Sequence, residues 1–391
     1  MSTNHHLHSM TSQKHLFDIP PDIHYLNGAF MSPLMKSVSE SGMEGMRRKL
    51  HPWAIHSEDF FTQAEAVKEK FGRLVNSPAQ QIAIIPSASY GLKSAVNNIP
   101  VNTGNHVVVV SNDFPSDYYT IRAWCQINKK EMKVIDAPDI LNGRGAAWTE
   151  KIVNAISTDT NAIILSTIHW TDGTKFNLKE IGEKCKATNT LFIADGTQSV
   201  GAIPIDVTDF HLDALVCAAY KWLMGPYSIG VAYYSKAFSN GTPIEDSWMN
   251  RSNANDFTKL TRYVDDYKPG AARYNVGEFS NPILLSMLDR ALQQLHDWKI
   301  DAIQNYCSQL IQPLLLYLKE NGYWYEQDQF RANHLFGFLL PASIDKDLLL
   351  RALQKNKVFV SVRGDGIRVS PHVYNDESNI NALINTLKQQ R

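Results

Sequence analysis

The chain has 391 residues, of which 44% are hydrophobic and 20% are charged, and its formal net charge is −1. This length exceeds that of one ordinary domain and can supply a large packed core. The balanced charge argues against nucleic-acid and membrane-surface partners, which favour a strong basic excess. No apolar run approaches the roughly 18 residues of a membrane span.

The cysteines are scattered and lack the CxxC or Cys/His spacing of a disulfide framework or a metal site. Free buried thiols and no bound metal are therefore expected. The N-terminal residues lack the apolar run of a signal peptide, which favours the reducing cytoplasm as the location. The four cysteines are Cys125, Cys185, Cys217 and Cys307.

Apolar side chains at helical spacing predict an amphipathic helix over residues 61–75. Helical stretches also separate a series of short, continuously apolar runs, which are typical of strands covered on both faces. Such alternation implies right-handed crossovers and a mainly parallel sheet, so the predicted fold class is α/β. The apolar runs occupy residues 82–85, 107–110, 162–166, 191–194, 214–219 and 230–234.

The C-terminal third predicts a smaller α+β domain. Asn281 and Pro282 form a helix start, and a second helix is expected to bend at Pro313 and to end by Gly322. Short strands follow, with helices between them. We expect a large domain over residues 30–280, and a small domain made of residues 1–29 and 281–391. The short strands are expected near residues 335–340, 358–362 and 367–370.

Polar residues at strand ends are the candidates for chemistry, because ligands of open α/β sheets bind beyond the carboxyl ends of the strands. Asp195 ends one apolar run, and Lys221 ends the run about one βα-unit later. Burial lowers the pKa of a lysine, as in lysines that form Schiff bases. An aspartate facing a pyridine nitrogen keeps that nitrogen protonated. Taken alone, an aspartate such as Asp195 at the end of a strand is more often a loop cap or an ion-pair partner.

Two further strand ends fit the same cofactor. Residues 86–91, which include Ala88 and Ser89, open a helix where backbone N–H groups can bind phosphate, although a serine N-cap explains them equally well. Phe114 follows another strand and can stack on a flat ring, or simply pack in the core. Together the four segments supply a phosphate cradle, a stacking ring, a pyridine partner and a reactive lysine, as pyridoxal 5′-phosphate (PLP) requires.

Residues 194–201 (ADGTQSVG) and 220–226 (YKWLMGP) resemble the paired cofactor motifs of the class V aminotransferase superfamily, whose members are PLP enzymes of fold type I. The resemblance implies that Lys221 forms the internal aldimine and that Asp195 binds the pyridine nitrogen. It further implies that Gln198 bonds the 3′-oxygen of the cofactor, and that Ala88 and Ser89 contact its phosphate.

The same resemblance gives roles to residues elsewhere. Arg368 would bind the substrate carboxylate with its guanidinium fork, although a surface arginine on an edge strand is the alternative. His169 and Trp170 follow another apolar run, and this strand-end position predicts that they line the substrate pocket, with packing as the alternative. Asn27 lies in a segment similar to the family's segment that enters the active site. Further expected cofactor contacts are Phe114, Asp117, Tyr220, Trp248 and, reaching the neighbouring subunit of a homodimer, Asn281.

The reaction implied by the resemblance starts when an amino-acid substrate displaces Lys221, whose amine then acts as the base at Cα on the way to a quinonoid. Several features resemble kynureninase and isopenicillin N epimerase-like proteins, which favours a lyase, an epimerase or a kynureninase-like hydrolase. Transamination is the alternative. A cysteine desulfurase is disfavoured because residues 361–370 contain no cysteine, and because Tyr220 stands where desulfurases usually have histidine.

Two alternatives from other classes remain. A regulatory module that has kept the fold without its chemistry would be expected to lack the lysine or the aspartate, and both are present. A nucleotide-binding protein would show GxxxxGK[ST] or GxGxxG after a strand, and neither motif occurs there.

Overall fold

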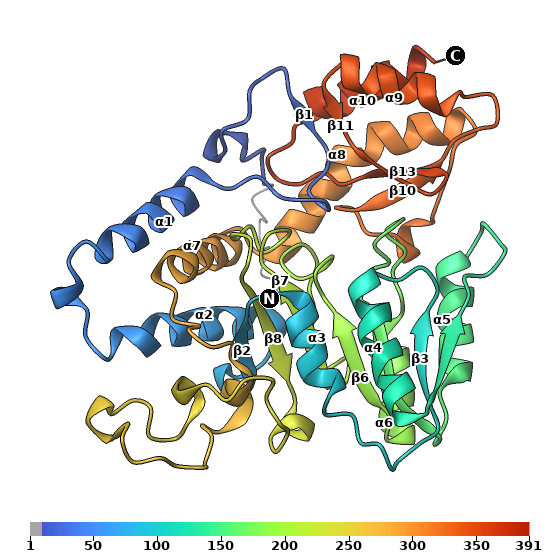
Figure 1. The fold of residues 1–391 in the computed structure, drawn as a ribbon. Helices are drawn as coiled ribbons and strands as arrows, with labels where there is room; N and C mark the ends of the chain where they lie inside the picture. Colours follow the sequence, from blue (N-terminus) through green and yellow to red (C-terminus); the bar gives the residue numbers. More distant parts are fainter. Residues whose placement is uncertain (1–9, 391) are drawn as a thin grey trace, which may run out of the picture.

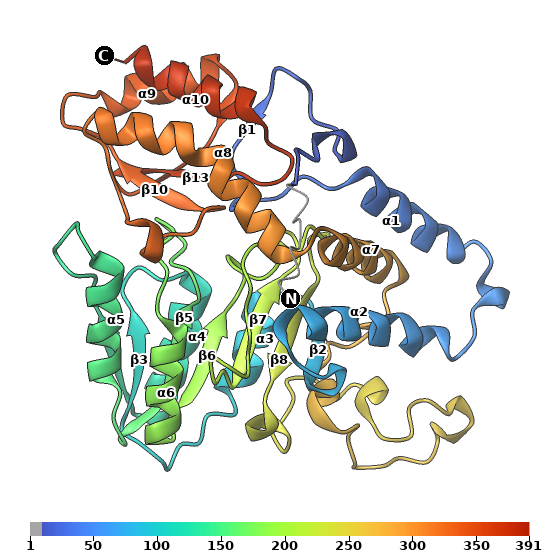
Figure 2. The same cartoon turned by 180° about the vertical axis from the view of Figure 1, so that it is seen from behind.

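The computed structural model describes residues 10–390, so the N-terminal residues considered for a signal peptide lie almost entirely outside it. The chain forms a large domain around one wide sheet and a smaller domain above one edge of that sheet (Figure 1). The reverse view shows α1 (Lys36–Arg48) lying apart from the wide sheet, beside α7 (Pro282–Trp298) (Figure 2).

The wide sheet has seven strands in the order β2-β8-β7-β6-β5-β3-β4. Strand β8 is antiparallel to both of its neighbours, and the other pairs are parallel, so six strands point the same way. Their carboxyl ends therefore meet at one edge. The strands are β2 (Ile82–Ile85), β3 (His106–Val110), β4 (Glu131–Ile135), β5 (Thr160–Ser166), β6 (Leu191–Asp195), β7 (Ala214–Ala218) and β8 (Gly230–Tyr234).

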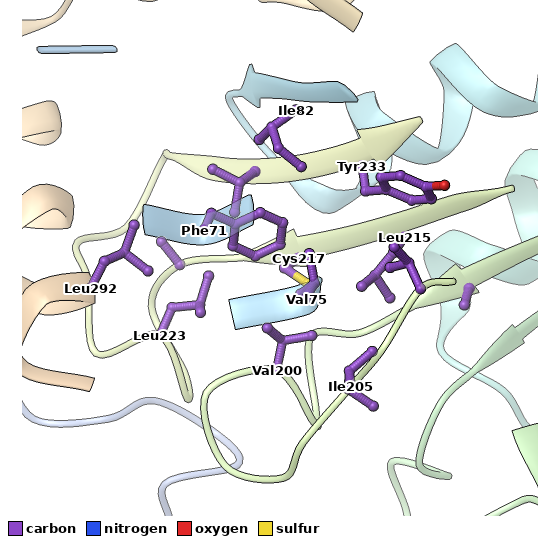
Figure 3. Packing of buried hydrophobic residues seen from close by; sticks show 14 of the residues in the cluster. Phe71, Val75, Ile82, Val200, Ile205, Leu215, Cys217, Leu223, Tyr233 and Leu292 are labelled. Carbon is purple, nitrogen blue, oxygen red and sulfur yellow. The ribbon is translucent and has the colours of Figure 1, made fainter. Parts of the chain in front are cut away.

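Helices cover both faces of this sheet, so the mainly parallel α/β prediction is confirmed. One face packs against α3 (Ala88–Val96) and α4 (Pro115–Asn128). The other face packs against α2 (Asp59–Val75), α5 (Arg144–Ala155), α6 (Leu178–Thr188) and α7. Figure 3 shows part of this second core, where Phe71 and Val75 of α2 lie against side chains of β7 and β8.

The small domain is built on a four-stranded antiparallel sheet in the order β12-β13-β10-β9. The N-terminal segment joins this domain, because β1 (His24–Tyr25) pairs with β11 (Val358–Phe359). The remaining elements are α8 (Ile300–Glu320), β9 (Trp324–Tyr325), β10 (Phe336–Leu339), α9 (Lys346–Lys355), β12 (Ser361–Arg363), β13 (Gly366–Val369) and α10 (Glu377–Lys388).

The structure adds detail at three places. Strand β4 has no counterpart among the predicted apolar runs, because it is a partly exposed edge strand. Pro313 lies inside α8, which is one helix up to Glu320. Helix α7 packs against α1 and α2, so the domain boundary at residue 281 stays a prediction. Within residues 10–390, no helix combines the length and apolar character needed to cross a membrane.

Candidate active site

A cavity of about 330 Å³ lies at the edge where the parallel strands end. The chain reaches this edge just after β2, β3, β5, β6 and β7, and the turn before β8 closes its rim. The structure thus brings together side chains from distant parts of the sequence. The predicted site residues that line the cavity are Ala88, Ser89, Phe114, Trp170, Asp195, Gln198, Tyr220 and Lys221.

Lys221 follows β7 and is only 5% exposed. Burial lowers the pKa of its amine to about 8, and the charge of Asp195 opposes this shift. The Nζ atom lies 5.4 Å from the ring centroid of Phe114 and 5.6 Å from that of Tyr220. A far larger fraction of this amine than of an ordinary lysine is therefore neutral, and hence nucleophilic, near neutral pH.

Asp195 ends β6 and is 4% exposed. Its Oδ1 accepts a hydrogen bond from the backbone N–H of Thr197 at 2.7 Å, and the Thr197 hydroxyl in turn accepts one from the Ala218 N–H. Burial raises the pKa of Asp195, although the Thr197 hydrogen bonds and Lys221 oppose that rise. A carboxyl group held this way needs a cationic or N–H partner in the cavity.

Asp117 lies behind the cavity wall in the first turn of α4 and is 2% exposed. Its Oδ2 accepts a hydrogen bond from Ser166 Oγ at 3.3 Å, whereas its buried Oδ1 has no hydrogen-bond partner. Burial and the nearby carboxylates of Asp195 and Asp113 raise its pKa well above the usual range. Asp117 therefore lies close to Asp195 and Lys221 but does not line the cavity.

One end of the cavity lies next to the N-terminus of α3. Ser87 caps this helix by accepting a hydrogen bond from the Tyr90 N–H at 3.2 Å, and its hydroxyl lies 3.0 Å from that of Ser89. Gly91 lets the helix approach the sheet, because a Cβ there would lie 2.8 Å from Val216. The N-terminus of α3 thus presents N–H groups at the cavity, and the N-cap and anion-binding interpretations are compatible.

Gln198 is held by contacts that fix the orientation of its side-chain amide. Its Oε1 accepts a hydrogen bond from Trp222 Nε1 at 3.0 Å, and its Nε2 donates one to the Ala29 carbonyl at 3.2 Å. The backbone carbonyl of Gln198 lies 2.8 Å from His334 Nε2. One N–H of the amide therefore stays available to an oxygen in the cavity.

Arg368 is 1% exposed and lies on β13, which is flanked by β12 and β10. The alternative of a surface arginine on an edge strand is therefore wrong. Its guanidinium donates to the Trp170 carbonyl at 2.7 Å and to Ser361 Oγ at 3.4 Å. Ser361 Oγ also donates to Asn27 Oδ1 at 2.7 Å, so Asn27 acts on Arg368 through Ser361.

His169 and Trp170 differ in where they point. Trp170 lines the cavity, packs edge-on against Phe114 at 5.6 Å and donates from Nε1 to the Asn112 carbonyl. His169 points into the core, where its ring lies 5.0 Å from that of Trp148. Burial alone would lower its pKa, but a hydrogen bond to Asp172 and the charge of that residue raise it overall.

Trp248 and Asn281 lie elsewhere in the chain. Asn281 caps α7 by accepting hydrogen bonds from two backbone N–H groups. Trp248 is 42% exposed in the short 3-10 helix Trp248–Asn250. Both line a second cavity of about 510 Å³, so within one chain they do not meet the cavity that Lys221 lines.

Several cavity residues escaped the sequence reasoning. Thr197 lies two residues after Asp195, and that adjacency is the signal that could have revealed it. Ser166 ends β5 and could have been found by the same strand-end rule. Tyr227 and Ser228 precede an antiparallel strand, where no such rule applies, although the positive φ of Ser228 marks a constrained turn.

This fold and cavity define a PLP fold type I protein. The family model described as aminotransferase class-V matches residues 35–383, so the chain belongs to the class V aminotransferase family. The cofactor of this chain is therefore pyridoxal 5′-phosphate. The cavity fits that assignment, because Lys221, Asp195 and the N-terminus of α3 offer partners for the aldehyde, the ring nitrogen and the phosphate.

Curated relatives are moderately similar. The uncharacterized aminotransferase YcbU of Bacillus subtilis is 25% identical over 83% of this chain and 83% of its own length. A kynureninase of Deinococcus radiodurans is 23% identical over 74% of this chain and 69% of its own. The cysteine desulfurase IscS of Clostridium botulinum is 28% identical, but over 46% of this chain and 43% of its own.

Solved structures share the fold at low identity. A C-DES mutant with glycine covalently linked to the PLP cofactor has a TM-score of 0.87 and 17% identity, covering 97% of this chain and 100% of that one. The complex of the cystine C–S lyase C-DES with its reaction product cysteine persulfide has a TM-score of 0.83 and 18% identity, covering 94% and 97%. The fold type I prediction is thus confirmed over nearly the whole chain.

Proposed function

We propose that this PLP enzyme acts on an amino-acid substrate through Lys221, with the chemistry of a lyase, an epimerase or a kynureninase-like hydrolase. The observation that carries the proposal is the placement of Lys221. Its buried amine, with a pKa of about 8, shares one cavity with Asp195 and the N-terminus of α3. Burial of this amine without an ion pair costs free energy, and strongly perturbed groups in a cavity cluster at functional sites.

The residues around the cavity divide into those that hold the cofactor and those that act on the substrate. Asp195 would hold a proton at the ring nitrogen, Gln198 would donate to the ring oxygen, and Phe114 would pack against the ring. Ala88 and Ser89 present N–H groups to the phosphate at the N-terminus of α3. When bound, the cofactor supplies an electron-poor ring that stabilises negative charge at the substrate Cα.

On the substrate side, Lys221 Nζ takes the proton from Cα, because its lowered pKa leaves it partly neutral at the working pH. Arg368 binds the α-carboxylate, and its hydrogen bonds to the Trp170 carbonyl and to Ser361 keep its guanidinium in place. Asn27 is a positioning residue that acts through Ser361.

The cysteines support the choice against a desulfurase. Such chemistry needs a reactive thiolate near the substrate. All four cysteines are buried and free, and burial raises the pKa of each thiol, to about 11 for Cys125 and about 12 for Cys307. Resemblance to a C–S lyase structure and to a kynureninase fits a reaction at the substrate's β- or γ-carbon better.

Transamination is the second candidate, favoured by the similarity to relatives described as aminotransferases. The residues described above serve both reactions, since each begins with removal of the Cα proton. The two differ in where Lys221 returns that proton. Transamination would require Lys221 to release that proton at a position other than the substrate Cα.

A homodimer is also part of the proposal. Among the described residues that line the Lys221 cavity, Lys221 is the sole arginine or lysine, so this chain brings no further cation to the phosphate end. Trp248 and Asn281 border a separate cavity and are free to complete the site of a second subunit. Light scattering of the purified protein tests this part of the proposal, and a monomer at working concentration would contradict it.

The first experiment is an absorbance spectrum of the purified protein before and after borohydride, followed by mass spectrometry of the reduced protein. We expect a visible band whose reduction fixes the cofactor on Lys221 and which Lys221→Ala abolishes. A panel of amino acids then separates the reactions. Release of pyruvate or alanine indicates a lyase or a hydrolase, loss of optical activity indicates an epimerase, and amino transfer to a keto acid indicates the second candidate.

A further inference from the structure

A second arginine lies on the same face of the small sheet as Arg368. In the antiparallel pair β12–β13, Ser361 is opposite Arg368 and Arg363 is opposite Gly366. Side chains two residues apart on a strand share a face, so Arg363 and Arg368 are diagonal neighbours, with Cα atoms about 7–8 Å apart. Gly366 has no side chain to separate them.

Arg363 lacks the partner that a half-buried guanidinium normally has. Its Nε atom is buried without a hydrogen bond, and one terminal nitrogen donates to the Val362 carbonyl at 2.7 Å. The ion pairs between described residues include neither Arg363 nor Arg368. Burial lowers the pKa of both arginines, so desolvation of these two cations is not offset by any carboxylate of the described chain.

Trp170 connects Arg363 to the active site. The guanidinium carbon of Arg363 lies 5.2 Å from the ring centroid of Trp170, a cation–π contact. The same residue lines the Lys221 cavity and accepts a hydrogen bond from Arg368 through its carbonyl. The positive charges of Arg368 and Arg363 both act on Lys221 and help to lower its pKa.

Arg363 also lines a third cavity, of about 500 Å³, whose wall includes Thr171 and Asp172, the two residues that follow Trp170 in the chain. This cavity also has the acidic side chains of Asp139, Asp172 and Asp365 on its walls, and Asp172 is already paired with Arg144. Among the described residues that line this cavity, Arg363 is therefore the cation without an ion pair, and Thr171 on the same wall follows Trp170 of the Lys221 cavity in the chain.

We propose that Arg363 binds a second carboxylate, carried on the side chain of the substrate, while Arg368 binds the α-carboxylate. The substrate class is then an amino acid with an acidic group at the end of its side chain. A guanidinium fork matches a carboxylate in bidentate geometry, and stacking on Trp170 restricts the orientation of that fork. This inference rests on the proposed function, because it assumes that the substrate amine reacts at Lys221.

The test uses unreactive acids as probes of the PLP-loaded enzyme, with binding measured by calorimetry. Succinate, glutarate and adipate are compared with butyrate, pentanoate and hexanoate, which have one carboxylate each. We expect at least one diacid to bind about 10-fold or more tightly than its monoacid. Arg363→Met should remove this preference and weaken diacid binding far more than monoacid binding, whereas Arg368→Met should weaken both classes.

Kinetics give a second readout, with L-glutamate and L-aspartate set against L-glutamine and L-asparagine. Arg363→Met should lower kcat/KM for the acidic substrate by about 100-fold, and lower that of its amide much less, because the amide loses only the effect of the Arg363 charge on Lys221. Arg363→Lys keeps the charge without the fork and should give an intermediate loss. Lys346→Met removes an exposed charge that contacts the same hairpin at Gly364, and should leave the diacid preference unchanged.

Two results would overturn the inference. One is equal binding of diacids and monoacids by the wild-type enzyme. The other is an equal loss for all acids in Arg363→Met, which would show that this residue acts as a distant charge only. A colourless protein that borohydride does not label at Lys221 would instead refute the proposed function, so the two failures are distinguishable.

Discussion

The lowered pKa of Lys221 predicts how fast the apoprotein takes up its cofactor at different pH values. Only the neutral amine attacks the aldehyde, so the rate follows the neutral fraction. With a pKa of about 8, that fraction rises from about 9% at pH 7 to about 91% at pH 9, a roughly 10-fold gain that then levels off. An ordinary lysine with a pKa of 10.5 would gain about 100-fold over the same interval and keep rising.

The assay is stopped-flow absorbance of apoprotein mixed with PLP, with borohydride trapping and mass spectrometry to assign the product to Lys221. The cofactor also titrates in this range, so each rate is divided by that of PLP with a simple alkylamine of known pKa. Lys221→Ala provides the control, because this variant keeps Lys268. Burial also lowers the pKa of Lys268 to about 8, but Lys268 does not line the cavity. We expect no stable visible band from this variant.

A corrected rate that climbs about 100-fold between pH 7 and pH 9 without a plateau would refute the reasoning, because it would show an amine with ordinary solvation. The charges around the amine allow a further check. Arg368→Met removes a nearby cation and should move the midpoint of the profile upward, towards the ordinary value. A midpoint that stays in place would show that the charge of Arg368 does not act on this amine.

The remaining predictions concern stability and cofactor binding. Lys221→Met should raise the free energy of unfolding of the apoprotein by about 3 kcal/mol below pH 8, because the lowered pKa of Lys221 destabilises the folded chain there. The gain should vanish as the pH rises past 10.5. Denaturant unfolding at several pH values measures this gain, and a gain that is constant with pH would contradict the prediction. Trp222→Phe should weaken PLP binding, because the Gln198 amide loses the hydrogen-bond donor that fixes its orientation. Fluorescence titration tests this prediction, and an unchanged affinity would rule out a positioning role for Trp222. Gly173→Ala should lower the free energy of unfolding by about 2 kcal/mol or more, since the φ angle of Gly173 is +77° and a Cβ would lie 2.1 Å from the Leu335 carbonyl oxygen. Thermal unfolding measures this loss, and an unchanged midpoint would refute the prediction.

Much of the fold was predictable because the central strands are buried on both faces and therefore appear as continuous apolar runs. Strand β4 escaped because its residues are partly exposed, with Glu131 and Lys133 among them, so neither a continuous run nor a clear alternation remains. The interior position of β13 was also hidden. It depends on pairing with β10 and β12, and one sequence does not reveal which short strands become neighbours.

The site was predictable to the extent that strand ends meet at one edge of a parallel sheet. Phe114, Asp195 and Lys221 reach the same cavity for that reason. The hydrogen bond from Trp222 to Gln198 was not predictable, because Trp222 lies in a turn and the direction of its indole N–H depends on packing between the domains. The stacking of Arg363 on Trp170 likewise joins residues of two domains that no local pattern connects.

The loop that carries Trp170 is bonded to the small domain at several points. The Lys175 N–H donates to the Phe330 carbonyl, the Ala332 N–H to the Gly173 carbonyl, and the Gly337 N–H to the Asp172 carbonyl. These hydrogen bonds hold the loop against the small sheet that carries Arg363 and Arg368. The loop and that sheet must therefore move together if the domains shift. Grafting residues 169–175 from a relative would accordingly change the size and the charge of the substrate pocket in a single step, which makes this loop the natural unit for redesigning substrate choice.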